Sequence, residues 1–136
     1  MNSPFLVAQI SDLHLKADHK LTYGVVDCLG ALRRAVDHLN ASQPRPDIVV
    51  ISGDLVDFGR PDEYALLATE LARLHMPFYL VPGNHDAYVP GAHDRAMQAW
   101  YDYVRGDDDP LIHHDDHKLF PYIRRRGPVA LIGCST

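Results

Sequence analysis

The chain has 136 residues, the length of one globular domain of ordinary size. Hydrophobic residues make up 46% and charged residues 23%, a composition that excludes disorder throughout the chain and a coiled coil. A net charge of −5 disfavours a broad cationic surface for nucleic acid.

The same composition favours a cytoplasmic protein. Apolar runs stay well below the roughly 18 residues of a membrane span, and no charged-then-apolar leader opens the chain. The two cysteines, Cys28 and Cys134, have no CxxC or framework spacing, so we expect buried free thiols in a reducing compartment. Nine histidines, many beside aspartates, direct attention to metal binding, because imidazole is the commonest metal ligand in proteins.

The first 81 residues predict alternating strands and helices. Short apolar runs rich in β-formers predict strands at residues 5–10, 47–52 and 78–81. A helical apolar stripe covers residues 23–40, and a second helix begins near Pro61, whose missing N–H suits a first turn. The order βαβαβ predicts an α/β fold in which parallel strands are covered by the intervening helices.

The remaining sequence gives weaker patterns. Residues 94–104 favour a short helix and residues 106–116 a polar loop. Residues 122–123 and 129–133 are typical of a hairpin, with the arginine-rich stretch 124–128 as its tip.

Polar residues follow each of the three predicted strands. They are SDLH at residues 11–14, GDLVD at 53–57 and PGNHD at 82–86. Because the carboxyl ends of parallel strands share one edge of the sheet, we expect these three loops to meet.

The side chains in these loops suit divalent cations. Carboxylate and amide oxygens together with imidazole nitrogens bind Mn²⁺, Fe²⁺, Co²⁺ and Zn²⁺. Asp12 and His14, two residues apart on an expected extended segment, would point the same way and hold one ion together. Asp54 has two oxygens with which to bridge two ions, Gly53 lets the backbone turn closely, and Asn84 adds a neutral oxygen. Two ions roughly 3.5–4 Å apart are the usual arrangement for phosphate-ester hydrolysis.

These motifs together resemble the metallophosphoesterase (calcineurin-like phosphoesterase) superfamily, whose opening blocks read D-x-H, G-D-x-x-D and G-N-H-D/E. The stretches ISDLH, YGVVD, RPD, SGD, GRPDEY and VPGNHD are similar to its cyclic-nucleotide and glycerophosphodiester phosphodiesterase branch. The resemblance runs over about residues 5 to 90 and more loosely to Thr136. It implies an αββα sandwich, of which this chain would supply the first half, βαβαβ plus a C-terminal hairpin.

The resemblance also implies residue roles. Asp12 and His14 would hold the first ion, Asp54 would bridge, and Asn84 would hold the second ion. A hydroxide between the two ions would attack phosphorus, and His85 would approach the phosphate or the leaving group as the catalytic residue.

The two further aspartates of these loops, Asp57 and Asp86, would orient ligands or His85, although capping roles remain open for both.

One family block is missing from the sequence. Complete sites of this family use further histidines, including a G-H-x-H block, and no G-H-x-H occurs in residues 1–136. The chain ends directly after a predicted strand. We therefore expect residues 1–136 to be the amino-terminal portion of a single metallophosphoesterase domain, an enzyme as the full-length protein and weak or inactive alone.

Alternatives stay open at this point. A chain with half its ligands could be a binding or scaffold protein that kept the fold without turnover. An exposed sheet face and edge would favour association, so we expect a homo-oligomer that acts on a small phosphodiester, without nucleic-acid polymer or membrane. The stretch HHDDH at residues 113–117 is expected to be a solvated loop. The sequence leaves open which phosphodiester and which metals are used.

Overall fold

A three-stranded parallel sheet forms the centre of the structure, a computed structural model that describes residues 4–87 and 121–134. β1 (Val7–Ser11), β2 (Ile48–Ser52) and β3 (Phe78–Val81) lie in the order β1-β2-β3, and both neighbouring pairs are parallel. Ser11 pairs with Ser52, and Ser52 pairs with Val81, so the three strands end side by side. The predicted parallel βαβαβ order is confirmed.

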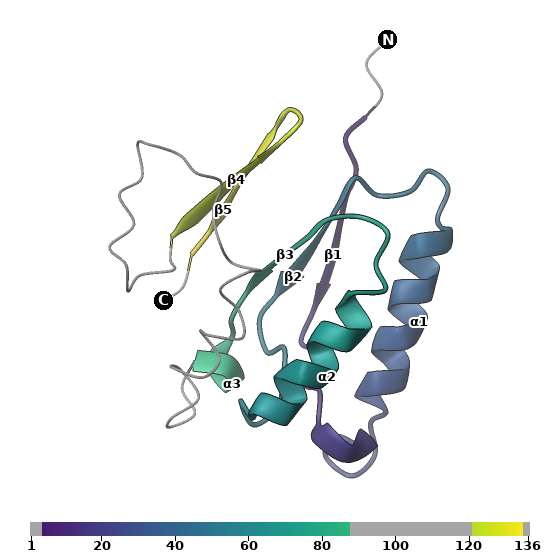
Figure 1. The fold of residues 1–136 in the computed structure, drawn as a ribbon, viewed down its shortest axis with the longest axis vertical. Coiled ribbons are helices and arrows are strands. Elements are labelled where there is room, and N and C mark those ends of the chain that lie inside the picture. Colours follow the sequence, from purple (N-terminus) through teal and green to yellow (C-terminus); the bar gives the residue numbers. More distant parts are fainter. Residues whose placement is uncertain (1–3, 88–120, 135–136) are drawn as a thin grey trace.

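Two helices cover one face of the sheet (Figure 1). α1 (Cys28–Ala41) begins after Asp27, whose side chain accepts a hydrogen bond from the Gly30 N–H. α2 (Pro61–Leu71) has proline in its first turn, as predicted. The core between helices and strands contains Leu15, Leu29, Leu32, Val36, Val49, Ile51, Leu55, Val56, Tyr64, Leu67, Leu71, Met76, Leu80 and Tyr122.

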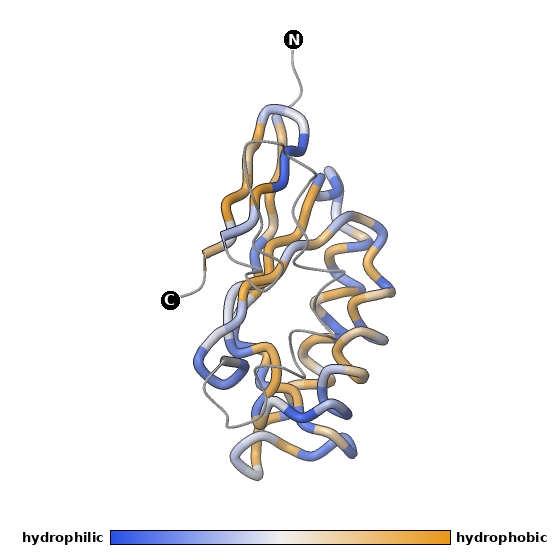
Figure 2. Tube along the Cα trace, turned by 60° about the vertical axis from the view of Figure 1, so that its left-hand side comes forward, coloured by the Kyte–Doolittle hydropathy of each residue, from blue (hydrophilic) through white to orange (hydrophobic). Residues whose placement is uncertain are grey.

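The opposite face of the sheet is approached by a hairpin (Figures 1 and 2). β4 (Tyr122–Arg126) and β5 (Val129–Gly133) are antiparallel, with Arg126 paired to Val129. The Tyr122 hydroxyl donates to the Leu80 carbonyl at 2.7 Å, which attaches β4 to β3. Two short helical turns, η1 (Ala17–His19) and α3 (Asn84–Ala87), follow β1 and β3 near the carboxyl edge of the sheet.

The first helix is shorter than its apolar stripe predicted. It begins at Cys28 instead of residue 23, because Thr22 and Val26 pair across a tight turn in which Gly24 has φ +75°. Tyr23 and Val25 are therefore exposed, at 73% and 78%, and the prediction that Val25 belongs to the apolar stripe of a helix is wrong.

Two further expectations are corrected. The arginines at 124–126 lie within β4 and not in the hairpin tip, which consists of Gly127 and Pro128. Their side chains stay close to the sheet because Arg124 and Arg126 lie over the Tyr79 ring, 5.6 and 5.2 Å from its centroid. Both cysteines are free, but Cys134 is exposed and Cys28 half-buried, so neither is a buried thiol.

The helix expected at residues 94–104 and the loops expected at 106–116 and 113–117 lie outside the described residues. Among the residues that are described, no helix combines the length and hydropathy that crossing a bilayer requires.

Candidate metal centre

The loops after the three strands are joined by backbone hydrogen bonds. The Asp12 N–H donates to the Gly53 carbonyl at 3.1 Å, and the His14 N–H donates to the Asp54 carbonyl at 2.8 Å. On the other side, the Gly53 N–H donates to the Val81 carbonyl at 3.0 Å. The ladder of the sheet thus continues into the loops, and the expected meeting of the three loops at one edge is confirmed.

The backbone of these loops is not extended. Asp12, His14 and Asp54 have φ values of 54°, 41° and 43°, in the left-handed region that non-glycine residues rarely adopt. The expectation that Asp12 and His14 lie on an extended segment is therefore wrong. Such residues persist only where surrounding contacts hold them, and they concentrate at functional sites. Gly53, with φ +77°, makes the close turn that the sequence indicated.

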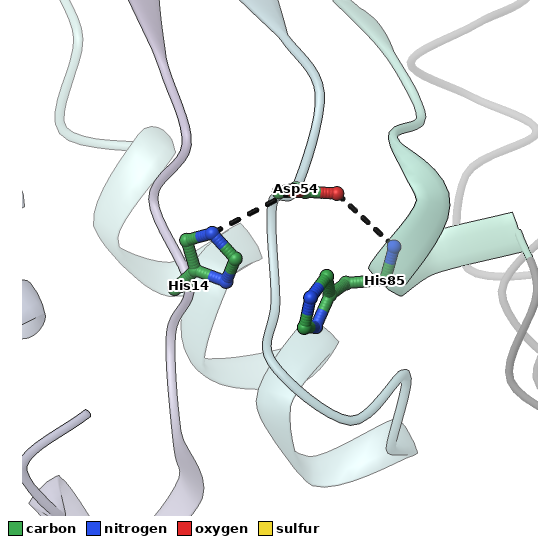
Figure 3. A group of neighbouring side chains, drawn as sticks. All are labelled: His14, Asp54 and His85. Atoms are coloured by element: carbon green, nitrogen blue, oxygen red, sulfur yellow. Dashed lines mark hydrogen bonds and ion pairs between the residues drawn. The ribbon is translucent and has the colours of Figure 1, made fainter. Parts of the chain in front are cut away.

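Three side chains form a compact group at this edge: His14, Asp54 and His85 (Figure 3). One ligand atom from each lies within 4.8 Å of the others. His14 Nε2 is 3.6 Å from Asp54 Oδ2, and the two imidazole rings meet edge to face with centroids 4.7 Å apart. The backbone N–H of His85 donates to Asp54 Oδ1 at 3.0 Å. All three residues are partly exposed, so an ion has access to them.

The donor set fits a borderline divalent cation. Two imidazoles and a carboxylate are the ligand types that suit Zn²⁺, Fe²⁺, Mn²⁺ and Co²⁺. His14 Nε2 and Asp54 Oδ2 face one another as two potential acceptors, an arrangement that a cation between them would stabilise. The residues present therefore fit the metal that the sequence predicts.

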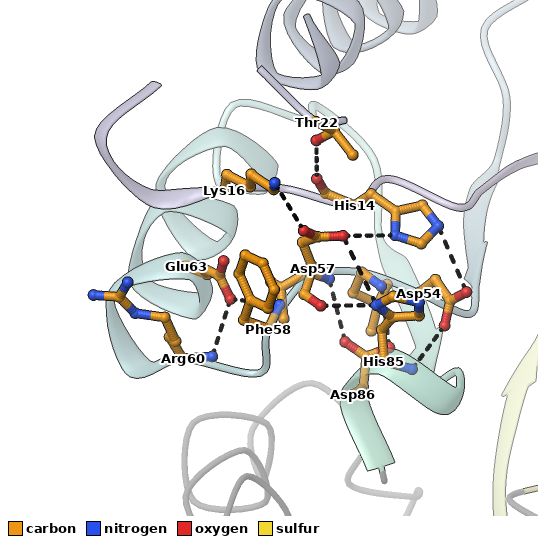
Figure 4. Close-up of polar contacts among 12 residues, drawn as sticks. His14, Lys16, Thr22, Asp54, Asp57, Phe58, Arg60, Glu63, His85 and Asp86 are labelled. Atoms are coloured by element: carbon orange, nitrogen blue, oxygen red, sulfur yellow. Dashed lines mark hydrogen bonds and ion pairs between the residues drawn. The ribbon is translucent and has the colours of Figure 1, made fainter. Parts of the chain in front are cut away.

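Asp57 lies behind the histidines, 6% exposed (Figure 4). Its Oδ1 is 3.4 Å from His14 Nδ1 and 3.8 Å from His85 Nδ1. Its backbone carbonyl accepts a hydrogen bond from His85 Nδ1 at 2.7 Å. That bond is the largest cause of a raised pKa at His85, opposed by desolvation and reinforced by the charges of Asp54, Asp57 and Asp86.

Hydrogen bonds from backbone N–H groups hold the Asp86 side chain. Its carboxylate accepts hydrogen bonds from the N–H groups of Leu55, Val56 and Gly83 and from the Tyr64 hydroxyl. Burial raises the pKa of Asp86, although these hydrogen bonds favour the ionised form. The side chain therefore fixes the loop after β2 against the loop after β3.

Two further contacts fix the loops that carry Asp54 and Asp57. A Cβ on Gly83 would lie 2.2 Å from both the Asp54 nitrogen and Asp54 Oδ1, so only glycine allows this approach. Glu63, 1% exposed, accepts from the N–H groups of Phe58 and Arg60, each at 3.0 Å, and closes the turn after Asp57. Burial raises the pKa of Glu63.

The structure brings together His14, Asp54 and His85, and it places Asp57 within 4 Å of both imidazoles. Asp12 is exposed at the end of β1, and its carboxylate is not part of the three-residue group. Asn84 is exposed as the first residue of α3, directly before His85.

Sequence reasoning missed three residues that contact the site: Thr22, Lys16 and Glu63. The Thr22 hydroxyl donates to the His14 carbonyl at 2.9 Å, and Lys16 Nζ lies 3.2 Å from Asp57 Oδ2. Only Glu63 had a readable signal, since it stands three residues after Arg60 at a helix start, the spacing of a capping box.

Comparison with known proteins gives one family and several relatives. The family model described as calcineurin-like phosphoesterase matches residues 5–132. A glycerophosphodiester phosphodiesterase of Enterobacter lignolyticus is 43% identical over 81 residues, 60% of this chain and 29% of the relative. A 3',5'-cyclic-nucleotide phosphodiesterase of Nostoc sp. is 31% identical over 86 residues, 63% of this chain and 32% of the relative. A cAMP/cGMP dual specificity phosphodiesterase of Mycobacterium tuberculosis is 37% identical over 86 residues, 60% of this chain and 27% of the relative. The matched part is thus about a third or less of each relative.

Proposed function

This chain belongs to the calcineurin-like phosphoesterase family, and from that premise we propose that it is part of a metal-dependent hydrolase of small phosphodiesters. The observation that carries the proposal is the group of His14, Asp54 and His85 at the carboxyl edge of the parallel sheet. The relatives named above act on glycerophosphodiesters and cyclic nucleotides, and we propose a substrate of this size for the whole protein.

The proposed ligands come from all three loops. His14 and Asp12 would hold one divalent ion, Asp54 would bridge to a second ion, and Asn84 would contribute to the second. Continuous backbone bonding among the loops supports this assignment, because it fixes the spacing of the loops. When bound, the ions would supply Lewis acidity toward the phosphate oxygens and lower the pKa of water.

We propose that His85, although its imidazole belongs to the same group, acts on the substrate and leaves the ion to His14 and Asp54. Its Nδ1–H donates to the Asp57 carbonyl, which leaves Nε2 as the atom available to a phosphate or a leaving-group oxygen. A raised pKa keeps a larger fraction of His85 protonated near neutral pH. In that form Nε2–H can donate a proton to the departing oxygen or stabilise charge on the phosphate. Asp57 and Asp86 would hold this arrangement without touching substrate.

We also propose that residues 1–136 are the amino-terminal portion of one metallophosphoesterase domain. The share of the relatives that the chain matches supports this. A cytoplasmic location is supported by the two free thiols. Homo-oligomeric assembly is supported by apolar side chains exposed on both sheets, Val7 at 48% and Ile132 at 63%.

The test is diester hydrolysis by the whole protein. Glycerophosphodiesters, cyclic nucleotides and an aryl diester would be assayed with Mn²⁺, Fe²⁺, Co²⁺ and Zn²⁺. We expect Asp54→Asn to lower kcat/KM at least about 100-fold, while Asp62→Asn, at an exposed carboxylate of α2, changes it little. Residues 1–136 alone are expected to be weak or inactive. A protein that folds, binds no divalent ion and cleaves no diester would contradict the proposal and favour a scaffold role.

A further inference from the structure

We propose that Lys16 is a positioning residue of the metal centre. It holds one oxygen of the Asp57 carboxylate, so that the other oxygen faces His14 Nδ1 and the Nε2 lone pair of His14 is presented to the ion. The inference rests on the proposed function only in taking His14 as a metal ligand. It concerns how this chain prepares that ligand before an ion arrives.

The backbone places Lys16 beside Asp57. Leu15 and Val56 form a parallel bridge, and the Asp57 N–H donates to the Leu15 carbonyl at 3.0 Å. This continuation of the sheet past β1 and β2 sets the two following side chains on neighbouring segments. Lys16 Nζ lies 3.2 Å from Asp57 Oδ2 and 4.9 Å from the centroid of the Phe58 ring (Figure 4).

Lys16 is more enclosed than a surface lysine. Its side chain is 18% exposed and that of Asp57 is 6% exposed, whereas the surface pair of Lys20 with Asp18 is 69% and 72% exposed. A pair shielded in this way interacts more strongly than an exposed pair, which contributes little. The Phe58 ring covers another side of the ammonium. Lys16 therefore has a fixed place and a defined partner.

The two carboxylate oxygens of Asp57 have different neighbours. With Oδ2 at Lys16, Oδ1 is directed to the histidines, 3.4 Å from His14 Nδ1. His85 Nδ1 already donates to the backbone carbonyl of Asp57. The Oδ1 atom of the Asp57 carboxylate is therefore available to His14. Within the described part of the chain, His14 Nδ1 is buried and makes no hydrogen bond of ordinary geometry, which leaves this carboxylate as its electrostatic partner.

This contact selects one tautomer of His14. A carboxylate facing Nδ1 favours the proton on that nitrogen, and the lone pair then lies on Nε2. His14 Nε2 is the atom 3.6 Å from Asp54 Oδ2, where the candidate ion would lie. Without the Lys16 ammonium, the Asp57 carboxylate loses the contact that fixes its rotation, and His14 loses its preferred tautomer.

The experiment compares Lys16→Met with Lys16→Arg and a matched surface control, Lys20→Met, in the whole protein. The tautomer of His14 is read from long-range ¹H–¹⁵N spectra of the metal-free protein at pH 8, and Mn²⁺ and Zn²⁺ affinities from calorimetry. We expect Lys16→Met to shift the His14 ring signals toward the Nε2–H form and to weaken metal binding about 10-fold. Lys16→Arg should restore both, and Lys20→Met should change neither.

Each outcome bears on the proposal. A folded Lys16→Met variant with unchanged His14 signals and unchanged metal affinity overturns it. A raised KM with unchanged tautomer also overturns it, because Lys16 would then contact the substrate. If Lys16→Met does not fold, Lys16→Gln must produce the same shift, since it removes the charge and keeps most of the stem. Neither the spectra nor the calorimetry requires turnover. A protein that cleaves no diester would contradict the proposed function, but the effect of Lys16 on the His14 tautomer and on metal affinity would still be measured.

Discussion

At the scale of single residues, the buried Asp86 carboxylate accepts four hydrogen bonds beside the site. Oδ2 accepts from the N–H groups of Leu55 and Gly83 at 3.0 and 2.8 Å, and Oδ1 accepts from the Val56 N–H and the Tyr64 hydroxyl. A buried backbone N–H group that is left without an acceptor lowers the free energy of unfolding. The loop that carries Asp54 therefore depends on a carboxylate that is itself only 2% exposed.

Asp86→Asn should destabilise the fold. An amide group can put its NH₂ toward the Tyr64 oxygen, but the Val56 N–H then faces a donor, which costs about 1–3 kcal/mol of unfolding free energy. Urea unfolding of the two proteins measures the difference. Adding Tyr64→Phe removes the acceptor for the NH₂, so the double variant should be less stable than Asp86→Asn alone. Equal stability of Asp86→Asn and the parent protein would contradict this account.

Gly83→Ala should disturb Asp54 directly. The new Cβ would lie 2.2 Å from the Asp54 nitrogen, a backbone atom that cannot move aside alone. Overpacking of this kind costs about 1–3 kcal/mol, and the displaced carboxylate should bind divalent ions less tightly. Urea unfolding and calorimetric titration with Zn²⁺ measure the two effects. The control is Gly24→Ala, where no atom of the described residues lies within 4 Å of the Cβ; its φ of +75° costs about 1 kcal/mol, and metal affinity should stay unchanged.

The sequence is sufficient to predict that the three loops meet, because this follows from the parallel strands. It does not separate the grouped side chains from Asp12 and Asn84, which stand at the same strand ends and are exposed. His14, Asp54 and His85 were all selected because each stands within a few residues of a predicted strand, and the parallel sheet brings them together. Lys16 was not selectable in this way. Its contact with Asp57 depends on the bridge between Leu15 and Val56, which extends the sheet beyond the apolar runs and has no sequence pattern.

At the scale of elements, the three strands of the parallel sheet were predicted to within two residues, whereas β4 ends three residues later than predicted and α1 begins five residues later. The apolar stripe continues through Val25, but Thr22 and Val26 pair across a turn there and the helix begins only at Cys28. Asp27 was the readable signal, because an aspartate whose side chain caps Gly30 marks a helix start. Periodicity alone therefore misassigned the segment that packs beside His14.

The contact between α1 and α2 supports a prediction about acid stability. Glu70 of α2, 3% exposed, accepts hydrogen bonds from Arg33 of α1 at 2.7 Å and from Arg73 at 3.0 Å. The bond from Arg33 is the largest cause of a pKa below the ordinary 4.5 at Glu70. A depressed pKa means that this carboxylate stabilises the fold above pH 4.5, and that the contribution is lost as pH falls through the folded-state pKa.

Glu70→Gln should therefore lower the unfolding free energy at pH 7, and the deficit relative to the parent protein should shrink below pH 4.5. The difference between the proteins is the proper readout, because Glu63 and Asp86, whose pKa values are raised, change stability in the opposite direction in both. Asp37→Asn, at a 65% exposed carboxylate that also pairs with Arg73, should have a smaller effect. A deficit that persists unchanged at pH 3 would assign Glu70 a packing role only.

At the scale of the whole molecule, Tyr122 joins the β4–β5 hairpin to the parallel sheet. Tyr122 is 2% exposed, and its hydroxyl reaches the carbonyl of Leu80 in β3. Its ring also fills the space that a Cβ on Gly133 would need, 2.3 Å away, so β5 contributes a glycine to the same contact. The sequence predicted the hairpin from its β-formers, but its contact with β3 joins residues 42 positions apart.

The Tyr122 contact should make the free energy of unfolding depend on pH in the alkaline range. Burial raises the pKa of Tyr122 to about 12 from the ordinary value of 10.0. Because the folded protein keeps the phenol neutral, the stabilisation by this group is complete below pH 10 and is lost as pH rises toward 12. Tyr122→Phe removes the titrating group together with the hydrogen bond to Leu80, so it should cost about 1 kcal/mol at pH 7 and should show a flatter decline between pH 10 and 12. Urea unfolding across that range compares the two proteins. Parallel declines would mean that the Tyr122 hydroxyl is hydrated in solution and does not hold the hairpin to β3.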